Sequence, residues 1–197
     1  MFEPVIIEKF GKSVHTFDID TKLFQNRIVY FSGDVSDESA KSVITQLLYL
    51  DSVSNDDINL YINSPGGSVT DGLAVVDTIN AIGSKVNTVG LGMCASMGAV
   101  LLVSGTGKRK CTKNCQILLH TASSFNGAQN VHEARVDFEH LSKLNDTCMQ
   151  IIANHSNFSI DELRELTKHD FWISSNDALE KGIVDSIIWK INRDKAF

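Results

Sequence analysis

Proline is scarce in this sequence, and long hydrophobic runs are missing. The 197 residues include two prolines, and no linker rich in glycine or serine divides them, which predicts a single domain over residues 1–197. No apolar run approaches the ~20 residues of a membrane-spanning helix. The N-terminus lacks the basic and hydrophobic regions of a signal peptide. We therefore expect a cytoplasmic protein that does not bind membranes.

Basic charge is also in deficit. The chain has 18 Lys and Arg against 24 Asp and Glu, for a net charge of −6. This balance gives no electrostatic reason to expect nucleic-acid binding. The four cysteines, Cys94, Cys111, Cys115 and Cys148, do not have zinc-knuckle spacing. Reduced thiols in a cytosol are the simplest interpretation.

What the sequence does contain is an alternation of short apolar strands with amphipathic helices. The pattern predicts strands at 5–7, 14–17, 27–31, 58–62, 86–91, 116–119, 170–173 and 183–188, and helices after Ser36, over 69–79 with an end at Gly83, after Ser96, over 130–155, after a capping box at Ser159 and Glu162, and over 174–181 with a stop at Gly182. Such alternation predicts an α/β fold with much parallel strand pairing.

Ser96 lies at one strand-to-helix junction, among small residues in the stretch GMCASMGA at 92–99. The N-terminal end of a helix carries free N–H groups and partial positive charge, which stabilise a developing negative charge. Small neighbours let a second backbone segment approach the hydroxyl. The stretch is not the G-x-S-x-G turn of the α/β-hydrolases. Taken alone, this stretch favours an ordinary helix cap at Ser96 over a nucleophile.

Two further strand ends carry groups of the same chemistry. The turn NSPGG at 63–67 follows one strand, and His120 ends another. In open α/β sheets, catalytic groups gather at the carboxyl ends of strands. A serine, a histidine and the N–H groups of a Gly-Gly turn are parts of an acyl-transfer site. A plain turn and a structural histidine are the more common explanations of the same residues, and the spacing does not choose an acid.

The resemblance to a known family narrows these alternatives. The stretches YINSPGGSVTDG at 61–72 and GMCASMGA at 92–99 resemble the two signature blocks of the proteolytic subunits of the Clp protease. The similarity extends from about Val5 to Ile188. It implies a Clp-protease/crotonase-like α/β fold, a repeated ββα superhelix with a protruding helix–strand handle. Several departures from the family pattern suggest a divergent or phage-type member.

The resemblance also implies the site. By position, the nucleophile is Ser96, the general base His120 and the triad acid Asp170, while the oxyanion-hole N–H groups belong to Gly67 and Met97. The family consists of serine endopeptidases that need no metal or cofactor. Ser96 is expected to attack the peptide carbonyl, and His120 to carry its proton to the leaving amine.

The implied assembly is a chamber. Family members form heptameric rings, two of which stack as a tetradecamer, and a hexameric AAA+ ATPase feeds unfolded polypeptide into it. Residues 1–18 would form the axial loop, and residues 121–155 the handle, with its strand at 121–129 and its helix at 130–155.

Some positions depart from the family pattern. Thr121 and Ala122 replace a usual Gln-Pro after the histidine, which adds a backbone donor there. An arginine before the acid is replaced by His169, which we hypothesise meets Glu133 of the opposite ring.

The ATPase-docking clefts of the family are lined by aromatic residues. Tyr61 fits one such position, whereas Asn59, Ala81 and Lys110 stand where many members have aromatic side chains. Because buried aromatic residues contribute strongly to interfaces, we predict weakened or altered docking to an ordinary Clp ATPase.

Three alternatives to the ATP-dependent peptidase stay open at this point. The first is a peptidase with a dedicated role that needs no ATPase, such as capsid maturation. The second is a weakly active or non-catalytic ring subunit. The third is an acyl-CoA enzyme of the crotonase type, which shares the fold and the oxyanion hole but does not normally use such a triad.

Overall fold

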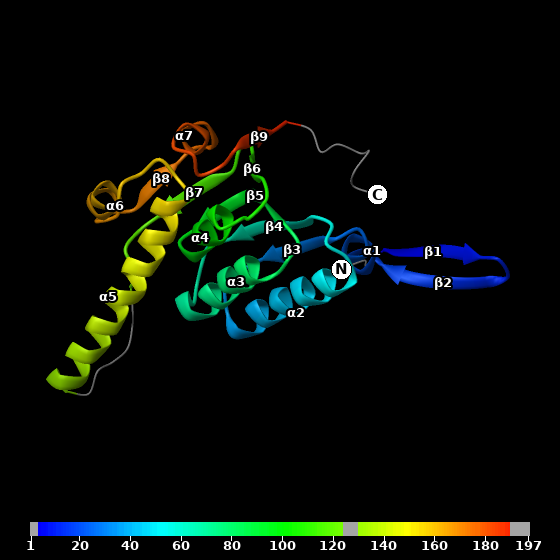
Figure 1. The fold of residues 1–197 in the computed structure, drawn as a ribbon, viewed down its shortest axis with the longest axis horizontal. Helices are drawn as coiled ribbons and strands as arrows, with labels where there is room; N and C mark the ends of the chain where they lie inside the picture. The colour runs from blue at the N-terminus through cyan, green and yellow to red at the C-terminus, as the bar shows by residue number, and fades with distance from the viewer. Residues whose placement is uncertain (1–3, 124–129, 190–197) are drawn as a thin grey trace.

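The computed structural model describes residues 4–123 and 130–189, apart from the side chain of Phe10 (Figure 1). Its elements are β1 (Val5–Phe10), β2 (Ser13–Asp18), α1 (Ile19–Gln25), β3 (Ile28–Ser32), α2 (Asp37–Val53), β4 (Ile58–Ser64), α3 (Val69–Ala81), β5 (Val86–Ala95), α4 (Met97–Val103), β6 (Arg109–Thr112), β7 (Gln116–Leu119), α5 (Val131–Asn154), α6 (Ile160–Leu166), β8 (Phe171–Ile173), α7 (Ser175–Glu180) and β9 (Ser186–Ile188).

A mostly parallel sheet organises the chain. Strands β3, β4, β5, β6 and β9 pair in that order and all run parallel. Strand β7 pairs parallel with the last residues of β5 and antiparallel with β8. Connections between parallel strands need a crossover, which the helices supply. The predicted α/β class with parallel pairing is confirmed.

The core lies between this sheet and its helices. Alternate residues of β4 are buried, and every residue of α4 is buried. Helices α2 and α3 each bury one face, which includes Leu47 and Leu50 of α2 and Val76 and Ile79 of α3. Helix α4 packs against β5, α3 and α5. The first helical turn after β5, which carries the predicted site, is therefore fixed by packing from several sides.

Two segments project from the head of the molecule, which is the sheet together with the helices packed on it (Figure 1). The β1–β2 hairpin, with Val5 opposite Asp18, extends on one side. The first half of α5 extends on the other. The predicted strand beside this helix, residues 121–129, falls mostly on 124–129, outside the described residues.

Most predicted elements are present, and the differences have local causes. The capping boxes at Ser36 and at Ser159 with Glu162 are formed, and Gly182 is left-handed after α7. The predicted end of α3 at Gly83 is wrong, because the helix stops at Ala81 with an extended Ile82 and Gly83 has no left-handed conformation. Strand β9 begins at Ser186 instead of 183. Helix α1 and strand β6 were not anticipated.

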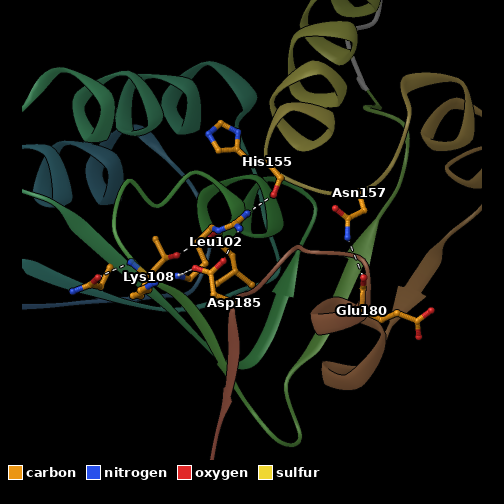
Figure 2. A network of polar contacts seen from close by, with 9 residues as sticks. Leu102, Lys108, His155, Asn157, Glu180 and Asp185 are labelled. Atoms are coloured by element: carbon orange, nitrogen blue, oxygen red, sulfur yellow. Dashed lines mark hydrogen bonds and ion pairs between the residues drawn. The ribbon is translucent and has the colours of Figure 1, made fainter.

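A polar network fastens the C-terminal end of α5 to the sheet (Figure 2). The Arg109 side chain forms an ion pair with Asp185 at 2.7 Å and donates to the carbonyl of His155, which caps α5. The backbone N–H of Arg109 donates to the same carboxylate at 2.8 Å. Burial raises the pKa of Asp185, but the Arg109 hydrogen bonds and charge outweigh it and hold that pKa below its usual value.

None of the helices in the described part of the chain is both long enough and apolar enough to cross a membrane.

Candidate active site

Ser96 occupies a strained turn between β5 and α4. Its φ is 53° and its ψ is −121°, and residues other than glycine adopt positive φ at a cost of about 1–3 kcal/mol. It holds the N-cap position of α4, but its side chain makes no capping hydrogen bond. Its backbone N–H donates to the carbonyl of Leu118 in β7 at 2.8 Å. The backbone is thus held while the hydroxyl has no capping role, which removes the helix-cap interpretation.

The Gly-Gly turn after β4 lies directly against this serine. A Cβ added to Gly66, which has φ of +99°, would lie 2.6 Å from Cβ of Ser96 and 3.0 Å from the backbone nitrogen of Met97. A Cβ on Gly67 would collide with the carbonyl oxygen of Val35. Backbone bonds of 2.8 Å from Val35 to Gly66 and from Ser68 to Val35 hold the turn. Only glycine permits this approach at both positions.

Two backbone donors stand free beside the serine. Within the described residues, the N–H groups of Gly67 and Met97 donate to no other group of the chain. The first belongs to the Gly-Gly turn, and the second opens α4, where helical N–H groups have no intrahelical acceptor. These two residues are the predicted oxyanion-hole positions. Free N–H groups near a nucleophilic serine can bind a negatively charged oxygen.

Ser96 and His120 line one narrow pocket of about 30 Å³. The rest of its wall is largely apolar and comes from α3, α4, β7, the segment after β7, and α5: Val69, Met97, Val100, Leu119, Ala122, Asn145, Cys148, Met149 and Ile152. The structure therefore brings together the predicted nucleophile and base, although they are 24 positions apart in the chain. Its largely apolar wall can contact apolar groups of a substrate at the mouth of the pocket.

Strand pairing sets the relation between His120 and Asp170. Leu119 of β7 is paired with Phe171 of β8, so the two predicted residues follow and precede a matched pair at the same end of these antiparallel strands. His120 is half-buried and Asp170 is exposed. Within the described part of this single chain, no hydrogen bond joins Ser96 to His120 or His120 to Asp170. Ser96, His120 and Asp170 therefore lie in one region of the fold, but within the described residues they do not form the hydrogen bonds of a catalytic triad.

The same pocket contains a second group that could act as a nucleophile. Cys148 on α5 is buried and lines the pocket. Burial raises its pKa to about 11, so almost no thiolate exists near neutral pH. A nucleophilic cysteine needs the opposite shift. The chemistry of the pocket therefore falls to the serine.

Sequence reasoning missed two residues that hold the segment after His120. The carbonyl of Thr167 accepts from Thr121 through its N–H at 3.2 Å and its hydroxyl at 2.9 Å. Oδ1 of Asn145 accepts from the N–H of Ala122 at 2.9 Å. The available signal was that Asn145 is a polar residue on the apolar face of α5, one turn before Cys148.

Comparison with known proteins gives consistent matches over nearly the whole chain. Residues 11–190 match the family described as Clp protease. A protein named ATP-dependent Clp protease proteolytic subunit from Streptococcus sanguinis is 39% identical over 193 residues, covering 96% of this chain and 98% of that protein. Proteins of the same name from Streptococcus agalactiae and Streptococcus salivarius are 39% and 40% identical over 188 residues, covering 94% of this chain and 96% of each relative.

Proposed function

Because the chain belongs to the Clp protease family, and is therefore a peptidase, we propose that it is a serine endopeptidase in which Ser96, His120 and Asp170 form the catalytic triad. The single observation that carries this assignment is the pocket in which Ser96, with a left-handed backbone and an unused hydroxyl, meets His120. A strained serine that shares a pocket with a base becomes an activated nucleophile once the two are hydrogen-bonded.

Each group has a defined task in the proposed reaction. Ser96 Oγ attacks the peptide carbonyl as His120 accepts its proton, and the carbonyl oxygen becomes an oxyanion that binds the N–H groups of Gly67 and Met97. The protonated imidazole then gives its proton to the leaving amine, which leaves an acyl-enzyme. A water activated by His120 hydrolyses the ester. Asp170 orients the imidazole and stabilises its charge.

We propose that assembly completes this site. The structure is that of one isolated chain, and within its described residues the proposed triad residues form no hydrogen bonds with one another. The projecting half of α5 exposes Val131, Val136 and Phe138 by 82%, 64% and 71%. Apolar side chains this exposed favour contact with another protein surface. Heptameric rings stacked as a tetradecamer, with residues 121–155 as the handle between them, would cover this surface. The proposed contact of His169 with Glu133 across that junction stays a prediction.

The proposed partner is an AAA+ ATPase that supplies unfolded polypeptide. The relatives are named ATP-dependent proteolytic subunits, which supports such a partner here. Residues 1–18, which include the β1–β2 hairpin, would border the entry pore. Docking is expected to be weaker than in aromatic-rich members, because Asn59 and Lys110 offer no aromatic ring to the partner. The Asn59 side chain is instead hydrogen-bonded to Asn87 at 3.3 Å, and Lys110 lies in one cross-strand row with Tyr61. A cytoplasmic location suits the four buried free cysteines.

Fluorophosphonate labelling combined with native mass measurement tests the proposal. We expect wild type and Ser42→Ala, an exposed serine on α2, to be labelled once per chain in a tetradecamer. Ser96→Ala should assemble equally well and remain unlabelled. Cleavage of a short peptide should follow the labelling, and cleavage of a folded protein should require an added Clp ATPase. Labelling that survives Ser96→Ala, or a wild-type tetradecamer that is never labelled, would contradict the proposed nucleophile.

A further inference from the structure

The backbone just beyond His120 is anchored at two consecutive residues. Thr121 is bound to the carbonyl of Thr167 through both its N–H and its hydroxyl. Ala122 donates its N–H to Oδ1 of Asn145 at 2.9 Å. The first anchor comes from the end of α6, three residues before Asp170, and the second comes from α5. The two anchors fix this backbone relative to both the acid-bearing segment and the pocket wall.

The place of Asn145 on its helix gives this contact a direct relation to the pocket. Asn145, Cys148 and Ile152 follow each other at helical spacing and all line the pocket that Ser96 and His120 share. Cys148 and Ile152 are buried. An amide at the first of these positions costs desolvation unless it is hydrogen-bonded. The bond to Ala122 meets that need, and it connects the wall of the pocket to the chain two residues beyond His120.

We propose that Asn145 is a positioning residue that holds His120 in register with Ser96 by binding the N–H of Ala122. The inference rests on the proposed peptidase function, and it adds a residue that acts through the backbone instead of on substrate. Without the amide, the Ala122 N–H loses its partner and the chain after His120 is held from one side only. Small displacements of a catalytic group lower the rate strongly, about 100-fold for ~1 Å.

The central experiment removes the bond from each of its two ends. Asn145→Leu keeps the approximate size but deletes the acceptor, and Asn145→Asp keeps an acceptor oxygen. Ala122→Pro deletes the donor, because proline has no N–H. Gln150→Leu is the matched control, because Gln150 is an exposed amide on the same helix whose side chain donates to Asn154. Each assembled variant is measured for the rate and the final extent of fluorophosphonate labelling and for kcat and KM on a short peptide.

A positioning role has a distinct signature in these data. Asn145→Leu should slow labelling and lower kcat about 5- to 20-fold, while the final extent of labelling and the native mass stay at wild-type values. Asn145→Asp and Gln150→Leu should remain within about threefold of wild type. In the Ala122→Pro background, Asn145→Leu should add less than about twofold, because the bond is already gone. A reduced extent of labelling at an unchanged rate would instead show a purely structural role and overturn the proposal.

A second measurement tests the proposal without Ala122→Pro, in case that variant does not fold. Amide hydrogen exchange of residues 120–123 should be faster in Asn145→Leu than in wild type and unchanged in Gln150→Leu. Equal exchange in all three proteins would overturn the proposal, as would equal catalytic rates or losses that multiply independently in the double variant. Failure of the proposed function looks different, because the wild type itself would then remain unlabelled, whereas the exchange comparison would still report on the contact.

Discussion

The two halves of α5 have the same secondary structure but different surroundings. In the C-terminal half, Cys148, Met149 and Ile152 are buried against the head and line the pocket. In the N-terminal half, Val131, Val136 and Phe138 are exposed. One end of this continuous helix therefore packs into the core, and the other end exposes apolar side chains. The difference indicates that the first half is suited to contact with another surface, which residues 4–123 and 130–189 do not provide.

The sequence pattern alone does not distinguish these halves. Ala134, Phe138, Leu141, Cys148 and Ile152 share one face of the predicted helix, but Phe138 is 71% exposed and Ile152 is 3% exposed. Apolar periodicity identifies the face that avoids water, but it does not identify the protein surface that covers this face. Substitutions in the two halves should therefore act on different properties.

The largest effect on folding is expected in the pocket half. Ile152→Ala removes a buried side chain from a packed core and should lower the free energy of unfolding by about 2–5 kcal/mol. Urea unfolding of dissociated subunits measures this change. Gln150→Leu, on the exposed side of the same half, provides the control and should leave stability nearly unchanged. A loss below about 1 kcal/mol for Ile152→Ala would mean that the two halves do not differ as described.

The projecting half should respond in assembly instead. Phe138→Ser removes an exposed ring, so the stability of the dissociated subunit should change by no more than about 0.5 kcal/mol. The native mass should fall from that of the double ring to that of smaller species, because the proposed ring–ring contact loses an apolar anchor. Arg135→Gln, which breaks an exposed ion pair with Glu139, is a control expected to retain the wild-type mass. An unchanged mass for Phe138→Ser would place the ring–ring contact elsewhere.

A smaller and pH-dependent effect is expected at the anchor of the pocket half. Asp185 has a lowered pKa in the folded protein, so its ionised form stabilises folding above its unfolded pKa of ~3.9. That stabilisation is lost as the pH falls through the lower folded value. Asp185→Asn should therefore be less stable than wild type at pH 7, and the gap should narrow below pH ~4. Urea midpoints for both proteins across this range provide the measurement, and a gap that widens in acid would contradict the assigned ion pair.

Local patterns predicted much of the fold because they act within a few residues. The capping box at Ser159 and Glu162 and the strand that ends at His120 needed no knowledge of the partner elements. Strand β9 was less predictable, because the apolar residues Ile183 and Val184 precede it and are buried without pairing in the sheet. Hydrophobicity alone does not separate burial beside a sheet from membership in it.

The features of the candidate site were likewise predictable only where the signal lies within a few residues of the chain. The junctions at Ser96 and at the Gly-Gly turn could be found because each is a strand end followed by small residues. The positive φ of Ser96 and the bond between Asn145 and Ala122 could not, because both depend on packing between elements far apart in the chain. The preference of Asn145 for Ala122 appears only once α5 lies beside the end of β7.

The bond from Arg109 to the carbonyl of His155 and the buried residues Cys148, Met149 and Ile152 hold the C-terminal half of α5 in place, while its first half projects. Its 24 residues form a rod of about 36 Å at ~1.5 Å per residue. In the proposed double ring, a force on the far tip would be passed along the rod to its packed half, which carries Asn145. Mechanical load on the tip would in this way reach the loop that bears His120 without any contact at the pocket itself.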